Sequence, residues 1–351
     1  MNPEKKIRVL IVDDSAVTCR VLAKLLEDPA IEIAGTARDP YEARDKILEL
    51  APDVVTLDIE MPRMDGLTFL RILQKHHPLP VIIISALTQA GSRTALEALE
   101  AGAVDVLGKP HFIKEQLIDC VKGAAEARLS KQPPAAPAGN GRPSPSVVPA
   151  VFHSRQAILI GASTGGTEAI KYVLSQLPSD LPGICIVQHI PAQFSKTFAE
   201  RLDALCAMEV REAVDGDQIR PGLALIAPGD YHMMLIREND CYRVSLNQQP
   251  LVHFVRPAVD MLFSSAAACV GKYGVAALLT GMGSDGATGM KNLRGAGAFT
   301  IAQNEESCVV YGMPRAAVEL GAVERVLPLD KIPAAIIQAV RTRALNSSPE
   351  K

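Results

Sequence analysis

AILIGASTGGTEAI, residues 157–170, is an apolar run that leads through a glycine-rich turn into an amphipathic segment. Such a run is typical of a buried strand, and the spacing after the turn is typical of a helix. The pattern continues with GICIVQ at 183–188, GVAALLTG at 274–281, AFTIAQ at 298–303 and a final helix. We therefore predict a doubly wound α/β domain over residues 153–345.

One section of this domain departs from the alternation. Between Glu209 and Asn247, the motifs APGD and REND separate short strand-like runs. Turn-forming residues between such runs favour an antiparallel hairpin. We expect the domain to carry this hairpin as an insertion.

The first part of the chain repeats the α/β pattern in a shorter form. The five runs IRVLIV, IEIAGTA, DVVTL, VIIIS and VDVLG alternate with amphipathic segments. Nearly continuous apolar strands separated by helices predict a parallel sheet that is covered on both faces. We predict a doubly wound, five-stranded domain over residues 1–128.

A proline-rich segment separates the two predicted domains. KQPPAAPAGNGRPSPSVVPA, residues 131–150, holds six of the 25 prolines and has no apolar periodicity. Such a composition is typical of a semi-extended linker. We assign residues 129–152 to it.

The composition excludes several classes of function. Lys and Arg total 36 against 39 Asp and Glu, with no basic cluster and no helix-turn-helix pattern, so neither nucleic acid nor a DNA-binding output domain is expected. No uncharged apolar run reaches the roughly 18 residues of a membrane span, and the N-terminus lacks a signal sequence, so we expect no membrane insertion. Seven cysteines without a CxxC pair favour a reducing compartment, and we expect the protein to be cytoplasmic.

Acidic and phosphate-binding residue types gather at the strand ends of the first domain. Asp13 and Asp14 follow the first strand, Asp58 ends the third, Ser85 ends the fourth and Lys109 follows the fifth. Clustered carboxylates repel one another unless a hard cation or an ammonium group balances them. The pattern predicts a magnesium site and an aspartyl phosphate, although Asp14 taken alone could equally cap the next helix.

The motifs VDDS, LDIEMPRMDG, IIIS and GKP resemble the receiver domain of bacterial two-component response regulators, over about residues 5–128. The resemblance implies Asp58 as phosphoacceptor; Asp13, Asp14, Asp58 and the backbone of Glu60 as Mg²⁺ ligands; and Ser85 and Lys109 as phosphorylation-switch residues. One position departs from the pattern, because Val106 stands where many receivers carry an aromatic residue. Signalling through a rotating aromatic ring is therefore not expected.

The glycine-rich turn at Gly161–Gly166 matches the context of a G-x-S-x-G nucleophile elbow with Ser163 as nucleophile. A nucleotide-phosphate loop is an equally weighted reading of this short motif. The histidines that follow the linker, and so could serve as base, are His153, His189, His232 and His253. His189 stands just past the neighbouring strand, and Asp285 in LTGMGSDGATGM could orient it or could simply cap a helix. The chain order Ser, His, Asp disfavours an ordinary lipase.

GASTGG, VQHIP, APGDYHMM, HFVRPAVDMLF, LTGMGSDGATGM and CVVYGMPRAA together resemble the catalytic domain of the chemotaxis protein-glutamate methylesterases. The resemblance implies Ser163 as nucleophile, His189 as base, Asp285 as its orienting carboxylate and the Met282 amide as oxyanion donor. It also implies that glutamate methyl esters and glutamines of chemoreceptors are the substrates, with no cofactor for hydrolysis. It implies a chemotaxis histidine kinase as the phosphoryl donor. The two-domain layout suggests that the receiver gates the catalytic site, and the alternative is an independent receiver that only localises the enzyme.

Two alternatives stay open at this stage. The second domain could be a non-catalytic binding module, with GASTGG serving as a phosphate loop. A serine hydrolase could instead draw its acid from Asp215 or Asp217 and its base from His232 or His253.

Overall fold

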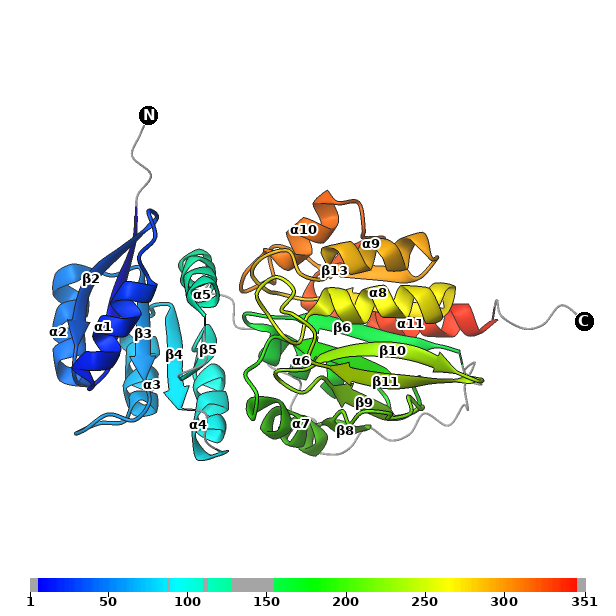
Figure 1. Cartoon of the computed structure of the whole chain (residues 1–351), viewed down its shortest axis with the longest axis horizontal. Helices are drawn as coiled ribbons and strands as arrows, with labels where there is room; N and C mark the ends of the chain where they lie inside the picture. Colours follow the sequence, from blue (N-terminus) through cyan, green and yellow to red (C-terminus); the bar gives the residue numbers. More distant parts are fainter. Residues whose placement is uncertain (1–5, 87–88, 110–112, 128–154, 346–351) are drawn as a thin grey trace, which may run out of the picture. The chain divides into compact units, whose positions relative to one another are not determined.

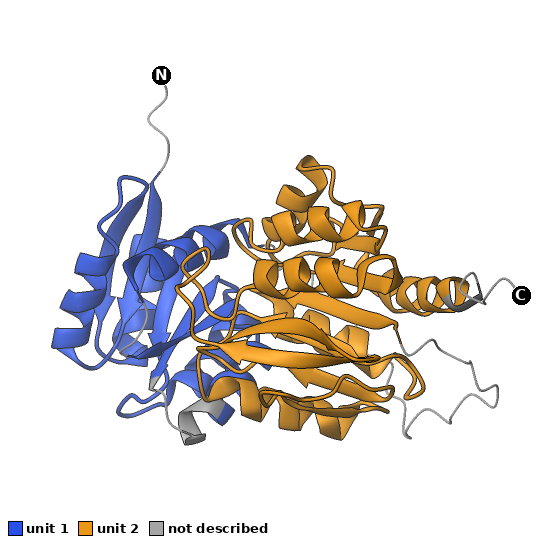
Figure 2. Cartoon of the chain, turned by 45° about the vertical axis from the view of Figure 1, so that its right-hand side comes forward, with its two compact units in different colours: residues 1–130 blue, residues 131–351 orange. Residues whose placement is uncertain are grey.

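The structure, a computed structural model, describes residues 6–86, 89–109, 113–127 and 155–345 (Figure 1). The chain forms two compact units, residues 1–130 and 131–351, which are coloured separately in Figure 2. The predicted linker, residues 129–152, lies outside the described residues, and the predicted domain boundaries stay a prediction.

The first unit is built on a five-stranded parallel sheet in the order β2-β1-β3-β4-β5. Its strands are β1 (Ile7–Val12), β2 (Ile31–Ala37), β3 (Val54–Asp58), β4 (Val81–Ala86) and β5 (Asp105–Lys109), and its helices are α1 (Ala16–Leu25), α2 (Pro40–Leu50), α3 (Gly66–His76), α4 (Gln89–Glu100) and α5 (Lys114–Glu126). Helix α1 packs against α5, and α3 packs against α4. Right-handed crossovers place these pairs on opposite faces, so the predicted doubly wound fold is confirmed.

The strand order reverses between β1 and β3, and this reversal positions the acidic residues. From β1 the chain moves to β2 on one side and then returns to β3 on the other. In such sheets the crevice at the carboxyl ends of the two diverging strands is open to ligands. Asp13 directly follows β1 and Asp58 is the last residue of β3, so both lie at this crevice.

The second unit has a seven-stranded parallel sheet in the order β14-β13-β12-β6-β7-β9-β8, and a separate antiparallel hairpin, β10-β11. The strands are β6 (Ala157–Ala162), β7 (Ile184–Gln188), β8 (Glu209–Glu212), β9 (Leu223–Ile226), β10 (His232–Glu238), β11 (Cys241–Asn247), β12 (Gly274–Leu278), β13 (Phe299–Gln303) and β14 (Arg325–Leu327). The helices are α6 (Gly166–Ser175), α7 (Phe194–Leu205), α8 (Val259–Cys269), α9 (Ala287–Gly295), α10 (Met313–Glu319) and α11 (Ile332–Leu345).

The predicted hairpin is present, but it is shorter than the section 209–247 assigned to it. Only β10 and β11, joined through the REND turn, pair antiparallel. Strands β8 and β9 instead extend the main parallel sheet beyond β7. Two four-residue strands offer too short a pattern to separate an edge of a parallel sheet from a hairpin, which accounts for the difference.

The hairpin lies alongside α8, as Figure 1 shows, and both contribute to the core of the second unit. Met233 and Leu235 of β10 belong to one buried apolar cluster with Leu262 and Phe263 of α8. This packing fixes α8 above β6 and β12, the two strands that lead into the predicted catalytic turns. No described helix is both long and apolar enough to cross a membrane.

Gly161, near the end of β6, allows α8 to approach the sheet closely. A Cβ atom there would lie 2.3 Å from Val259 Cγ1 and 3.1 Å from Leu278 Cδ1. We therefore expect Gly161→Ala to lower the free energy of unfolding by about 1–3 kcal/mol, because the helix must shift to make room.

Gly295→Ala is the matched control, since it replaces a helical glycine of the same unit whose added Cβ would have no neighbour within 4 Å. This variant should be neutral or stabilising by up to about 1 kcal/mol. Urea denaturation followed by circular dichroism measures both. Equal effects of the two substitutions would contradict the role assigned to Gly161.

Candidate functional site

Ser163 lies in the turn between β6 and α6, where the backbone needs glycine. Gly165, the N-cap residue of α6, has a φ of +74°, which side-chain-bearing residues rarely adopt. A Cβ on Gly166 would lie 2.2 Å from Gln188 Oε1 and 2.6 Å from Ala162 Cβ. The turn is therefore tight, and Ser163 is only 8% exposed within it.

Sheet register brings His189 to this serine. Ala162 on β6 is paired with Gln188 on β7, so the next residue along each strand is Ser163 and His189. His189 donates its backbone N–H to the Ala162 carbonyl, and its Nδ1 atom lies 3.0 Å from Ser163 Oγ. The two side chains that the sequence analysis paired are thus within hydrogen-bond distance.

Asp285 reaches the other side of the same imidazole. It follows β12, which is the other neighbour of β6 in the sheet, and its Oδ2 atom lies 2.7 Å from His189 Nε2. An ionised carboxylate only accepts hydrogen bonds, so Nε2 carries the proton of a neutral imidazole. Nδ1 then has a lone pair that faces the Ser163 hydroxyl.

The carboxylate of Asp285 is buried, with 2% exposure, and is held by three donors. Burial opposes its ionisation, but the hydrogen bond from His189 and those from backbone N–H groups lower its pKa below the ordinary value. The backbone donors are Val259 at 2.6 Å and Asp260 at 2.9 Å, at the start of α8. Asp285 therefore caps α8 and not α9, the helix that follows it, whose N-cap residue is Gly286.

Two polar side chains that the sequence analysis did not single out hold the turns of the site together. Gln188 donates through Nε2 to the carbonyls of Ser163 and His189, at 2.8 and 3.1 Å. Thr280 accepts the Ser163 N–H with its carbonyl and donates its hydroxyl to the carbonyl of Thr164. A polar residue at a fully buried strand end is the sequence signal that could have identified both.

Met282 lies in the backbone that passes over Ser163. A Cβ atom on its neighbour Gly281 would be 2.7 Å from Ser163 Cβ, so the chain approaches the serine closely here. Among the hydrogen bonds between described residues, none uses the Met282 N–H as donor. This N–H can therefore donate to a new acceptor beside the serine.

The acidic residues of the first unit also come together. The carboxylates of Asp13, Asp14 and Asp58 present oxygen atoms within 4.8 Å of one another. Lys109 Nζ lies 2.7 Å from Oδ2 of both Asp13 and Asp58. Burial raises the pKa of Asp58, and the ion pair with Lys109 opposes that rise. Three carboxylates this close to one another, two of them paired with Lys109, offer the oxygen ligands that a hard divalent cation prefers.

The remaining predicted receiver residues lie at the same edge of the sheet or beside it. Ser85 is buried at the end of β4 and is paired with Gly108, next to Lys109. Glu60 stands two residues after Asp58 with an exposed side chain. Ser15 caps α1 by accepting the Thr18 N–H, so Asp14, although it could have been the cap, is not.

The alternative acids and bases have other partners. Asp217 pairs with Arg211 at 2.6 Å, and Asp215 accepts the Leu246 N–H. Among the described residues, neither His232 nor His253 is hydrogen-bonded to Ser163, and His153 lies outside them. The structure therefore does not support a catalytic set built from these side chains.

Comparisons with known proteins agree with both halves of the chain. A family model described as CheB methylesterase matches residues 158–336, and one described as response regulator receiver domain matches residues 9–122. A Syntrophus aciditrophicus protein named protein-glutamate methylesterase/protein-glutamine glutaminase 2 is 49% identical over 342 residues, covering 95% of this chain and 99% of that protein. A Pseudomonas aeruginosa protein of the same name is 50% identical over 346 residues, covering 96% and 98%.

A solved structure also resembles the second unit. The Thermotoga maritima CheB methylesterase catalytic domain has a TM-score of 0.51 and 39% identity, and the match covers 52% of this chain and 97% of that one. The relatives are named as enzymes, so the alternative of a non-catalytic binding module is wrong.

His232 yields a prediction about pH. It is fully buried; its Nε2–H donates to the Pro250 carbonyl at 3.0 Å, and its Nδ1 accepts the Ala258 N–H at 3.2 Å. Burial lowers its pKa, so the folded protein favours the neutral ring. The neutral ring of His232 therefore contributes fully to the free energy of unfolding above the unfolded-state pKa of about 6.5. This contribution is lost as the pH falls below that value.

The non-titrating variant His232→Gln removes this dependence. We expect the stability advantage of the wild type over this variant to shrink between pH 7 and pH 5, by at most about 1.4 kcal/mol per pH unit. Urea denaturation of both proteins at each pH measures it. An advantage that stays constant or grows on acidification would contradict a neutral, buried His232.

Proposed function

The chain belongs to the CheB methylesterase family, and we propose that it hydrolyses glutamate methyl esters of chemoreceptors to glutamate and methanol, under the control of its receiver domain. The observation that carries this proposal is the hydrogen-bond chain from Asp285 through His189 to Ser163. Such a chain is the arrangement that activates a serine hydroxyl for acyl transfer.

The proposed reaction begins with the imidazole of His189. Nδ1 takes the Ser163 proton as Oγ attacks the ester carbonyl, and the Met282 N–H donates to the oxygen that becomes negative. Because one well-placed oxyanion donor is worth roughly 2.7–4 kcal/mol, this amide is expected to raise the rate by about a hundredfold to a thousandfold. Asp285 stabilises the imidazolium that forms. His189 then gives the proton to the methoxy oxygen as its bond to carbon breaks, and methanol leaves.

The second half of the reaction uses the same groups. Water, deprotonated by His189, attacks the acyl-enzyme, and Ser163 leaves with its proton restored. The same steps applied to a glutamine side chain expel ammonia in place of methanol and yield glutamate. We therefore propose protein-glutamine deamidation at the same site, without a cofactor.

Regulation is proposed to start at Asp58. Asp13, Asp14 and Asp58, with the backbone of Glu60, would hold Mg²⁺. When bound, this ion would neutralise charge on the oxygens of the transferring phosphoryl group. Lys109 and Ser85 would bind the phosphoryl group on Asp58, and a chemotaxis histidine kinase would donate it. Added charge shifts the balance between an inhibited and an active arrangement. We propose that the hydrolysis and the phosphorylation both take place in the cytoplasm.

Replacing the nucleophile tests the reaction directly. We expect Ser163→Ala to lower both methanol release and glutamine deamidation by about a thousandfold or more, because neither reaction can form an acyl-enzyme. Ser175→Ala is the matched control, since Ser175 is the last residue of α6 and its hydroxyl donates to the Tyr172 carbonyl of the same helix. Both are measured on a methylated receptor fragment. Methanol release by Ser163→Ala at a near wild-type rate would rule out this nucleophile.

Replacing the phosphoacceptor tests the regulation. Mg²⁺ with acetyl phosphate should raise the esterase rate of the full-length wild type severalfold but leave that of Asp58→Asn unchanged, since the amide cannot be phosphorylated. Asp45→Asn, at an exposed position of α2, should respond like the wild type. If Asp58→Asn were stimulated to the same extent, Asp58 would not be the switch.

A further inference from the structure

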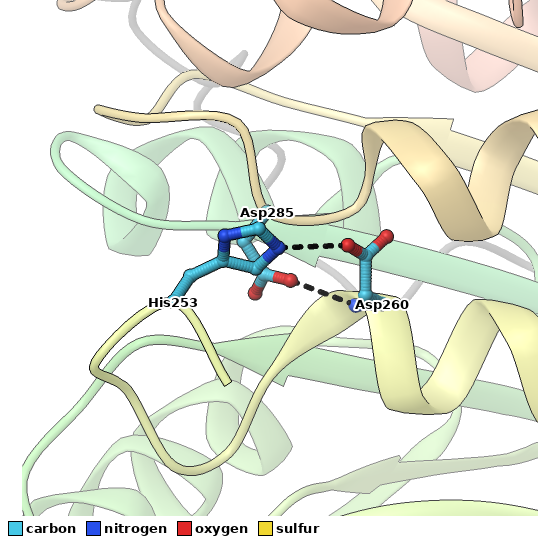
Figure 3. Close-up of side chains that lie close together, drawn as sticks. All are labelled: His253, Asp260 and Asp285. Carbon is cyan, nitrogen blue, oxygen red and sulfur yellow. Dashed lines mark hydrogen bonds and ion pairs between the residues drawn. The ribbon is translucent and has the colours of Figure 1, made fainter. Parts of the chain in front are cut away.

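The N-termini of α8 and α9 hold each other through two aspartates, as Figure 3 shows in part. Val259 and Asp260, in the first turn of α8, donate their backbone N–H groups to Asp285, which precedes α9. In return, Gly289 in the first turn of α9 donates its N–H to Asp260 Oδ1 at 2.6 Å. Each helix thus supplies a carboxylate to the other's unpaired N–H groups.

This reciprocal arrangement requires close approach of the two helices. A Cβ on Gly289 would lie 2.6 Å from Phe263 Cβ and 3.1 Å from the Asp260 carbonyl oxygen. Any larger residue would therefore separate α9 from α8. Since Asp285 is held by α8 and leads directly into α9, such a separation would also displace the carboxylate that faces His189.

His253, in the loop before α8, adds a third side chain to this contact between α8 and α9. Its Nε2 atom lies 3.0 Å from Asp260 Oδ2, and Figure 3 shows its ring directed at that carboxylate. Its backbone has a φ of +51°, a conformation unfavourable for a residue with a side chain. The ends of this loop are fixed by the buried His232, which bonds to Pro250 and Ala258. The strained backbone is therefore held in place.

The charges explain why a histidine stands here. Asp260 and Asp285 present carboxylate oxygens within 4.8 Å of each other. Burial and the nearby charge of Asp285 raise the pKa of Asp260, while Gly289 and His253 oppose that rise. Two carboxylates this close repel, so Asp260 alone would push Asp285 away from its place. A donor on Asp260 reduces that repulsion.

We propose that His253 and Asp260 form a positioning pair, which holds Asp285 in the orientation that the Ser163–His189–Asp285 set needs. This inference rests on the proposed function. Among the described residues, neither side chain of the pair is hydrogen-bonded to Ser163 or His189. The pair acts through Asp285, by fixing the start of α8 against α9 and by balancing the second carboxylate.

Two substitutions at His253 test the pair without endangering the fold, because the side chain is 41% exposed. In the full chain, His253→Ala should lower kcat for methanol release about fivefold to tenfold and leave KM within about twofold, since one hydrogen bond to a charged group is lost. His253→Gln retains an N–H donor and should recover most of the rate. Asp240→Asn, in the β10–β11 turn and 95% exposed, is the control.

Asp260→Asn separates positioning from stability. The amide oxygen can still accept the Gly289 N–H, and the like charge beside Asp285 is gone, so the free energy of unfolding at pH 7.5 should be unchanged or higher. The expected kcat is about tenfold lower, because an amide Nδ2 in place of Oδ2 cannot accept from His253, and the loop then no longer fixes the start of α8, which holds Asp285. A purely structural role would lower stability and activity together.

The outcomes distinguish this inference from the function on which it rests. A wild type that shows no Ser163-dependent methanol release contradicts the proposed function itself. A wild type that is active, with His253→Ala and Asp260→Asn both within twofold of its kcat, overturns only the positioning pair. The pair is also overturned if His253→Gln is as slow as His253→Ala, or if only KM changes.

Discussion

The buried negative charge of Asp285 is the constraint on which the catalytic unit depends. A carboxylate with 2% exposure is costly unless each oxygen finds donors. His189 supplies one donor, and the first turn of α8 supplies two. The histidine that this charge orients is the one that faces Ser163. The fold therefore balances the charge with the same contacts that assemble the site.

The two units use one topological device for two chemistries. Parallel neighbouring strands end at the same edge, so the residues that follow them meet there. In the second unit, the three adjacent strands β12, β6 and β7 lead to Asp285, Ser163 and His189. In the first unit, β1, β3 and β5 carry Asp13, Asp58 and Lys109 to one edge. Residues far apart in sequence thereby meet at one edge of a sheet.

The same device explains how much could be predicted from sequence. Strand ends can be recognised from apolar runs, so both parallel sheets and the neighbouring positions of Ser163 and His189 were predictable. The α8–α9 contact was not, because Asp260 and Gly289 meet through the packing of two helices, for which no local pattern exists. Gln188 could have been singled out as a polar residue at the end of a fully buried strand, but its partners, the Ser163 and His189 carbonyls, depend on the packing of the turns. Strands β8 and β9 were too short to be placed in the main sheet.

A covalent intermediate at Ser163 is the central step of the proposed reaction. Rapid-quench mass spectrometry of the full chain, mixed with a methylated receptor fragment, tests this most directly. We expect a transient adduct in which a receptor glutamyl group is esterified to Ser163, appearing before free glutamate and in step with methanol. Methanol release without any adduct, or an adduct on another residue, would contradict it.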